Sequence, residues 1–179
     1  MRHGLMIVAA LLALTACKQD EAAAPPPPAP LTEVALSYFC QMNIAEHGGP
    51  KGQIHLDGHE QPLFFAQVRD LVAYLKSPER DAEITAVYVS DMGRADSWEN
   101  PGAENWTAAE TATFVVGAEV AGGMGAPEIV PFADPARAAG FIARYGGQAL
   151  PFSDIPDDAA LGPVDLDQQL ETPSLESAS

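Results

Sequence analysis

A cysteine and a methionine two residues apart, Cys40 and Met42, carry the most distinctive chemistry in this chain. A thiolate and a thioether are soft donors, and soft donors favour Cu(I) over hard ions. Side chains at positions i and i+2 share one face of a strand or converge in a turn, so both sulfurs can reach one ion. The pair therefore predicts a binding site for Cu(I).

Cu(I) accepts two or three donors, so this pair needs at most one more ligand. Met124 is the strongest candidate, because the glycines of Gly122–Gly125 allow close backbone approach and leave its side chain unshielded. A histidine nitrogen is the alternative, and it would make copper affinity depend on pH. The other candidates for the third ligand are Met92, His47, His55 and His59, with His47 the first to test.

Hydrophobic periodicity predicts an α+β arrangement of elements around these residues. Strands are expected at 53–56, 83–90, 111–116, 128–132 and 148–152. Helices are expected at 62–76 and 135–145. Asp134 caps the second helix, Pro135 opens it, and Gly146-Gly147 stops it.

A weak internal repeat is present in the same region. Phe65-Ala66 and Tyr74-Leu75 match Phe132-Ala133 and Phe141-Ile142 at an offset of 67 residues in both cases. Each copy contains strands, a helix and a strand. The pattern predicts two repeats that form one compact unit, with boundaries at 34–92 and 93–152.

The N-terminus predicts export and lipid anchoring. Leu5–Leu14 is an apolar segment too short to span a membrane, and it ends in Leu-Thr-Ala-Cys. This ending resembles a bacterial lipobox, which implies a signal peptide at 1–16 and acylation of Cys17; the alternative is an ordinary signal peptide with a chance cysteine. Residues 17–33 form an Ala/Pro-rich, extended tether that holds the domain at the periplasmic side of the membrane. Lys18 after the acylated cysteine favours the outer membrane.

Lipidation of Cys17 leaves Cys40 alone in an oxidising compartment, where cysteines normally form disulfides. A lone thiol there is either buried and inert or kept for chemistry, and the neighbouring Met42 favours chemistry. The formal net charge of −16 argues against nucleic acid and against electrostatic docking on anionic lipid. Residues 153–179 contain seven acidic and no basic residues and are expected to form a disordered tail.

Seven segments in this order match one protein family. They are Tyr38–Met42, Gly49–Ile54, Pro62–Ala66, Val68–Asp70, Val89–Met92, Asn105–Trp106 and Gly122–Glu128. Together they resemble NosL, the family of accessory lipoproteins of nitrous oxide reductase. The resemblance implies two ββαβ units and a periplasmic Cu(I) chaperone that is not an enzyme. It also implies that copper is delivered for the cluster of nitrous oxide reductase, with Cys40, Met42 and Met124 as ligands. The reductase and its copper-cluster assembly proteins would be the partners.

Two other classes of function are compatible with a lone thiol. One is a thiol-dependent enzyme, because the fold of the NosL family is similar to that of organomercurial lyase. That chemistry needs a second thiol or an acid beside the first, and no Cys-His-Asn signature is present. The other is a non-catalytic anchored scaffold with a buried cysteine.

Overall fold

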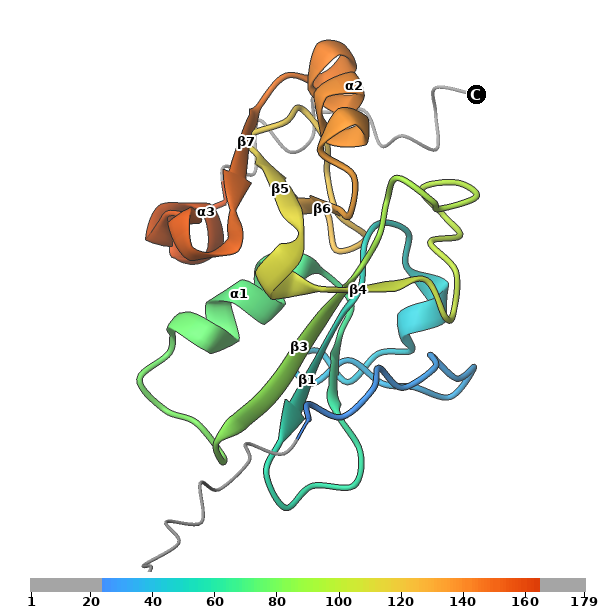
Figure 1. Cartoon of the computed structure of the whole chain (residues 1–179), viewed down its shortest axis with the longest axis vertical. Helices are drawn as coiled ribbons and strands as arrows, with labels where there is room; N and C mark the ends of the chain where they lie inside the picture. Colours follow the sequence, from blue (N-terminus) through green and yellow to red (C-terminus); the bar gives the residue numbers. More distant parts are fainter. Residues whose placement is uncertain (1–23, 165–179) are drawn as a thin grey trace, which may run out of the picture.

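Two antiparallel sheets, each with one helix of its own, make up the computed structural model, which describes residues 24–164 (Figure 1). The first sheet has the strand order β2-β1-β3-β4, from β1 (Gly52–Leu56), β2 (Leu63–Phe65), β3 (Ile84–Ser90) and β4 (Trp106–Ala108). The second has the order β6-β5-β7, from β5 (Thr113–Val116), β6 (Val130–Phe132) and β7 (Gln148–Pro151). The helices are α1 (Val68–Lys76), α2 (Pro135–Tyr145) and α3 (Asp157–Leu161), with 3-10 turns η1 (Ile44–Glu46), η2 (Ala109–Thr111) and η3 (Phe152–Asp154).

The internal repeat is visible in the topology. The central strand β1 pairs with β2 and β3, and the central strand β5 pairs with β6 and β7, all antiparallel. A helix follows the second strand in each unit, beginning at Val68 and at Pro135. The predicted α+β fold with two ββαβ repeats is therefore confirmed. Strand β4 joins the first sheet although it follows residue 92 in the chain.

The helix predicted at 62–76 is wrong at its start. Leu63–Phe65 forms β2, which pairs with Gly52–Ile54 of β1, and the helix begins only at Val68. Helical spacing and a short strand are hard to separate in an apolar run of this length. The cross-strand partner decides the outcome, because pairing with β1 buries Phe65 completely.

One main core joins the two sheets. Phe114 and Val116, on one face of β5, belong to this core together with Ile54 and Val89 of the first sheet. The opposite face of β5 presents Val115 to a smaller core beneath α2. Because successive residues of a strand point to opposite sides, this single strand connects both cores and makes the two repeats one unit.

The prediction of a disordered tail from residue 153 is wrong for its first part, because η3 and α3 form there. Ile155 and Ala160 are buried in the main core, and α3 packs beside α1 (Figure 1). Arg69 donates from Nε to the carbonyl of Ala160 at 3.2 Å, and Lys76 donates to the carbonyl of Ile155 at 2.8 Å. The few apolar residues of this segment are enough to fold it, because they pack against α1 and the main core. Residues 165–179 of the predicted tail lie outside the described residues.

The predicted tether is attached to the first sheet along part of its length. Tyr88 donates from its hydroxyl to the carbonyl of Pro26 at 2.7 Å. Ala29 exchanges two hydrogen bonds with the Gln53 side chain, at 2.8 and 2.9 Å. We call this segment, Pro26–Ala29, the strap. The predicted signal peptide and Cys17 lie outside the described residues. Among residues 24–164, no helix has the length and apolar character needed to cross a membrane.

Candidate metal centre

Cys40 lies at the tip of a small hairpin formed by Ala35–Ile44, which we call the Cys40 hairpin. Leu36 and Asn43 form an antiparallel bridge, and the Ser37 amide donates to the Met42 carbonyl at 2.9 Å. The Cys40 side chain is half-buried and Met42 is 39% exposed. The predicted cysteine–methionine pair therefore lies at the surface, on a turn closed by backbone hydrogen bonds.

An unusual backbone conformation shapes the tip of this hairpin. Gln41 has a φ of 58° and is the non-glycine residue with positive φ in the described chain. Its side-chain amide donates to the carbonyls of Ser37, at 3.2 Å, and Tyr38, at 2.7 Å. A left-handed conformation costs free energy for a residue with a Cβ. The two side-chain hydrogen bonds offset that cost and keep Cys40 and Met42 on either side of the bend.

The hairpin is fixed to the first repeat. The Tyr38 amide donates to the Phe64 carbonyl at 2.8 Å, and Ser37 Oγ accepts from the Ala66 amide at 3.3 Å. The ring of Phe39 packs edge-on against Phe65 with a centroid distance of 5.7 Å. Strand β2 and the residues after it therefore position the hairpin, although its tip is exposed.

Met124 reaches the base of the same hairpin from the second repeat. The Gly125 amide donates to the Gly122 carbonyl at 2.8 Å, which forms a tight turn between β5 and β6. The half-buried Met124 side chain packs against a small cluster that contains Ala35, Ile44 and Ala66. Ala35 and Ile44 are the two ends of the Cys40 hairpin. The structure therefore brings the predicted third sulfur ligand to the hairpin, across a large separation in sequence.

His47 lies against the Met124 turn as well. A Cβ atom on Gly123 would lie 2.5 Å from the Gly48 carbonyl oxygen and 2.7 Å from the Cβ of His47. Only glycine fits such a close approach. The Nε2 atom of His47 is buried and has no hydrogen-bond partner among residues 24–164. An unpaired buried imidazole nitrogen next to the Met124 turn is a free donor for a metal.

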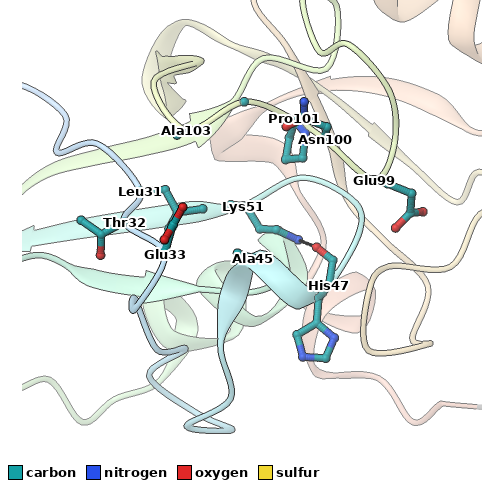
Figure 2. A pocket seen from close by; sticks show the side chains of 11 residues that line it. Leu31, Thr32, Glu33, Ala45, His47, Lys51, Glu99, Asn100, Pro101 and Ala103 are labelled. Atoms are coloured by element: carbon teal, nitrogen blue, oxygen red, sulfur yellow. Dashed lines mark hydrogen bonds between the residues drawn. The ribbon is translucent and has the colours of Figure 1, made fainter.

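Lys51 fixes the backbone on which His47 sits. Its side chain is buried, and its Nζ donates to the carbonyls of His47, Gly48 and Ala66, the last two at 2.8 and 3.3 Å. Figure 2 shows the ammonium group reaching the His47 backbone, while the imidazole ring extends to the opposite side. Burial lowers the pKa of Lys51 to about 8, and the carboxyls of Glu128 and Glu99 act in the opposite direction.

A small cavity lies on the Lys51 side of this backbone (Figure 2). It has a volume of about 170 Å³ and separates the Leu31–Glu33 segment from the loop that carries Glu99. The Glu99 carboxylate lies against Gly48, where a Cβ atom would be 2.4 Å from its Oε2. The backbone around His47 is therefore enclosed on this side by close contacts.

The buried carboxyl group of Glu128 packs against the Gly122–Gly125 turn that carries Met124. Glu128 Oε1 accepts from the backbone amides of Arg69, at 3.1 Å, and Ile129, at 2.9 Å, so it caps the N-terminus of α1. Glu128 Oε2 and Gln67 Nε2 have no partner within the described part of the chain. Both atoms lie against Gly122, where a Cβ atom would be 2.4 and 2.1 Å from them. Burial raises the pKa of Glu128 to about 8.

Three of the alternative ligands lie elsewhere. Met92 packs in the smaller core beneath α2, and its amide donates to the Pro131 carbonyl at 3.0 Å. His55 lies on β1, with Nε2 2.8 Å from Gln53 Oε1, and burial lowers its pKa. His59 is exposed in the β1–β2 connection. The structure thus gathers Cys40, Met42, Met124 and His47 around one hairpin and leaves the other candidates apart.

Sequence reasoning missed the support beneath the site. Lys51 and Glu128 were noted only as members of matching segments, and nothing in their local pattern shows that they are buried. Their contacts come from residues far away in the chain, such as Arg69 for Glu128. A charged residue next to glycine, as in Lys51-Gly52, is the one local signal that such a close-packed position leaves.

Comparisons with known proteins identify the family. The model of the NosL family matches residues 28–160 of this chain. The chain belongs to the NosL family. The copper-binding lipoprotein NosL of Achromobacter cycloclastes is 49% identical over 161 residues, which cover 89% of this chain and 83% of that protein. The copper-binding lipoprotein NosL of Stutzerimonas stutzeri is 31% identical over 159 residues, covering 87% of this chain and 80% of that protein.

The fold agrees with a solved member of the family. The crystal structure of the copper chaperone NosL from Shewanella denitrificans matches with a TM-score of 0.69 at 33% sequence identity. The match covers 74% of this chain and 98% of that one. The resemblance predicted from the sequence is confirmed. The region matched by the family model contains Cys40, Met42, His47 and Met124, whose role as ligands stays a prediction.

Proposed function

We propose that this chain is a copper metallochaperone that binds Cu(I) and delivers it for assembly of the copper cluster of nitrous oxide reductase. The observation that carries the proposal is the position of the half-buried Cys40 and the exposed Met42, together at the tip of a fixed hairpin in a member of the NosL family. The names of the relatives, copper-binding lipoproteins and a copper chaperone, support the same conclusion.

The site can hold copper firmly and still exchange it. Cys40 supplies the one anionic soft donor, as a thiolate, and Met42 adds a neutral thioether. Met124 and His47 both lie at the base of the hairpin, and we expect one of them to complete a three-donor set. Two or three donors leave an open coordination position, through which a ligand of the recipient can attack before the first donors leave.

Location and partners follow from the same family assignment. Acylation of Cys17 would anchor the protein to a membrane on its periplasmic side, with the outer membrane favoured by Lys18. The lipid chains would be its contact with the bilayer. Nitrous oxide reductase and its copper-cluster assembly proteins would be the partners in delivery.

The enzyme and scaffold alternatives are less well supported. A nucleophilic cysteine needs a nearby base or second thiol, and the sequence contains Cys17 and Cys40 alone. A scaffold does not need a half-buried thiol next to an exposed thioether. We therefore assign the chain a non-catalytic role.

A Cu(I) titration of residues 18–179 in competition with a chelator tests this function. We expect one tightly bound Cu(I) per chain, and we expect Cys40→Ser to abolish tight binding. Met42→Ala, Met124→Ala and His47→Ala should each weaken binding if the residue is a ligand. Met92→Ala is the matched control and should leave affinity unchanged, because Met92 packs in the core beneath α2. Wild-type affinity in the Cys40→Ser variant would refute the site.

A further inference from the structure

The large apolar side chains that the protein exposes are concentrated around Cys40. Val34, Leu36, Phe39 and Met42 are 80%, 51%, 50% and 39% exposed. Among residues 24–164 the remaining exposed large apolar side chain is Leu161, on α3. Single exposed apolar residues are common on protein surfaces, but a group of them marks an interaction site. We call Val34, Leu36 and Phe39 the apolar rim of the copper site.

The geometry of the hairpin holds this rim outward. Leu36 pairs with Asn43 and alternates with the buried Ala35 and Ser37, so its side chain points to solvent. Val34 lies in the turn just before the hairpin and is exposed as well. Phe39 contacts Phe65 with one edge and leaves half of its surface free. The side chains are therefore presented by a backbone that the rest of the fold keeps in place, with little conformational freedom to lose on binding.

The charges next to the rim are mostly acidic; the basic exception is Arg80, which lines the pocket beside Phe39 together with Glu79 and Asp81. Between Leu31 and Pro50 the charged side chains are Glu33 and Glu46, and both are exposed. Asp81 also lies at this side, where it accepts a hydrogen bond from the Tyr38 hydroxyl at 2.9 Å. The formal net charge of the whole chain is −16. An apolar surface with an acidic border is complementary to an apolar surface with a basic border.

We propose that the apolar rim is the docking surface for the protein that receives copper, and that this recipient presents an apolar patch bordered by basic residues. The inference rests on the proposed function, because transfer by ligand exchange requires the recipient's sulfur or imidazole donors to reach Cys40. Residues that flank Cys40 must then face the recipient. The acidic border disfavours two other occupants: an anionic lipid surface, and a second copy of this chain, whose acidic groups would face each other.

The experiment separates docking from copper binding. The double variant Val34→Ser, Leu36→Ser is made in the full, anchored chain and expressed as the single copy in denitrifying cells. Phe39 is left in place, because its ring packs against Phe65 and helps to fix the hairpin. We expect its Cu(I) affinity, measured by chelator competition, to equal that of the wild type. We expect the copper content of nitrous oxide reductase isolated from those cells to fall at least tenfold. Leu161→Ser is the matched control, since it removes an exposed apolar side chain far from the copper site in sequence and should change neither quantity.

The border of acidic residues is tested by charge reversal. Glu33→Lys with Glu46→Lys should lower the copper content of the reductase severalfold at unchanged Cu(I) affinity. If the double variant does not fold, as judged by circular dichroism, Leu36→Ser alone is used in its place. A full copper content of the reductase with either apolar variant would overturn the docking surface. A loss of Cu(I) affinity in these variants would also overturn it, because the rim would then belong to the metal site.

Two binding measurements address the other occupants. Vesicles of phosphatidylcholine and phosphatidylglycerol are sedimented with the soluble domain, and the mass of the domain is measured by equilibrium centrifugation. We expect no vesicle binding and a monomer. Vesicle binding or dimerisation that the double variant Val34→Ser, Leu36→Ser removes would overturn the proposal in favour of lipid or a second copy. Failure of the wild type to bind Cu(I) would instead count against the proposed function itself.

Discussion

The two ββαβ units share one topology but differ in the connection between their first two strands. In the first unit, residues 57–62 link β1 to β2 through a short turn at Asp57-Gly58. In the second unit, residues 117–129 link β5 to β6, and this longer connection carries Met124 to the Cys40 hairpin. The repeated strands and helices thus provide the frame, and the proposed copper ligands lie in segments that the two units do not share.

The helices of the two units differ in the same way. Five residues of α1 are buried, whereas Ala138 is the buried residue of α2. One reason is α3, which packs against α1, whereas no helix among residues 24–164 covers α2 in this way (Figure 1). Substitutions should therefore have large effects around α1 and small effects on α2.

The largest effect is expected where α3 meets the main core. Ile155→Ala removes a side chain that is 3% exposed and leaves a cavity. Buried Ile→Ala substitutions cost about 2–5 kcal/mol, so we expect the free energy of unfolding to fall by about 3 kcal/mol in urea denaturation. Leu161→Ala, at an exposed position of α3, should change it by less than about 0.5 kcal/mol. Equal effects of the two substitutions would contradict the packing of α3 against α1.

The next effect concerns the contact between the Met124 turn and His47. Gly123→Ala places a Cβ atom 2.5 Å from the Gly48 carbonyl oxygen, so the two segments must separate. Overpacking of this kind costs about 1–3 kcal/mol, and we expect a loss of about 2 kcal/mol of stability. Cu(I) affinity should fall as well if Met124 or His47 is a ligand. Unchanged affinity in a destabilised variant would restrict the site to Cys40 and Met42.

A pH dependence should arise from Glu128, whose pKa is raised by burial from 4.5 to about 8. The folded protein holds this proton more tightly than the unfolded chain, so the stabilisation is complete below pH 4.5 and is lost as the pH rises through about 8. Wild-type stability should therefore fall between pH 5 and 8, by up to about 1.4 kcal/mol per pH unit.

The variant Glu128→Gln should remove this decline, because glutamine does not ionise and its carbonyl can still accept from Arg69 and Ile129. Stability measured below pH 8 reports on Glu128 without a contribution from Lys51. The lowered pKa of Lys51, about 8, changes stability only between about pH 8 and 10.5. Glu110→Gln, at an exposed position, is the control. A wild-type slope that persists in Glu128→Gln would assign the proton to another group.

The smallest effect is expected on α2. Gly140 lies inside this helix, and no atom lies within 4 Å of the position its Cβ would occupy. Gly140→Ala should raise the free energy of unfolding by about 0.5–1 kcal/mol, because alanine has less conformational freedom to lose and higher helix propensity. Thermal denaturation would measure it. A destabilised variant would show that α2 is covered by a partner or by another segment.

Local signals explain which elements could be predicted from the sequence. Helix α2 begins and ends as predicted, because Asp134 accepts a hydrogen bond from the Ala136 amide at 2.8 Å and Gly146 terminates the helix with a φ of 72°. Strand β2 was missed because its three residues are defined by pairing with β1 rather than by their own pattern. Helix α3 was missed because its acidic segment gains stability only from contacts with α1.

The candidate site likewise contains residues that a local pattern reveals and residues that are brought together only by the packing of distant segments. Cys40 and Met42 were found from residue type and spacing alone, and both lie in one turn. The contact of the Met124 turn with His47 depends on how the two repeats pack, which no local pattern records. Glu128 was missed for the same reason, since it caps a helix 59 residues earlier in the chain.

The attachment of the strap to the first sheet would limit how far the domain can move from a lipid anchor. Because Tyr88 and Gln53 hold Pro26–Ala29, a lipid anchor at Cys17 would be joined to the domain through a leash of at most residues 17–25. At roughly 3.1 Å per residue, nine residues would reach at most about 30 Å, against about 50 Å for the whole 17–33 segment. A shorter leash confines the domain to a smaller volume above the bilayer and raises its effective concentration for partners held in the same membrane. Because the strap is attached to side chains of β1 and β3, the two inner strands of the first sheet, it also limits the directions in which the Cys40 hairpin can point.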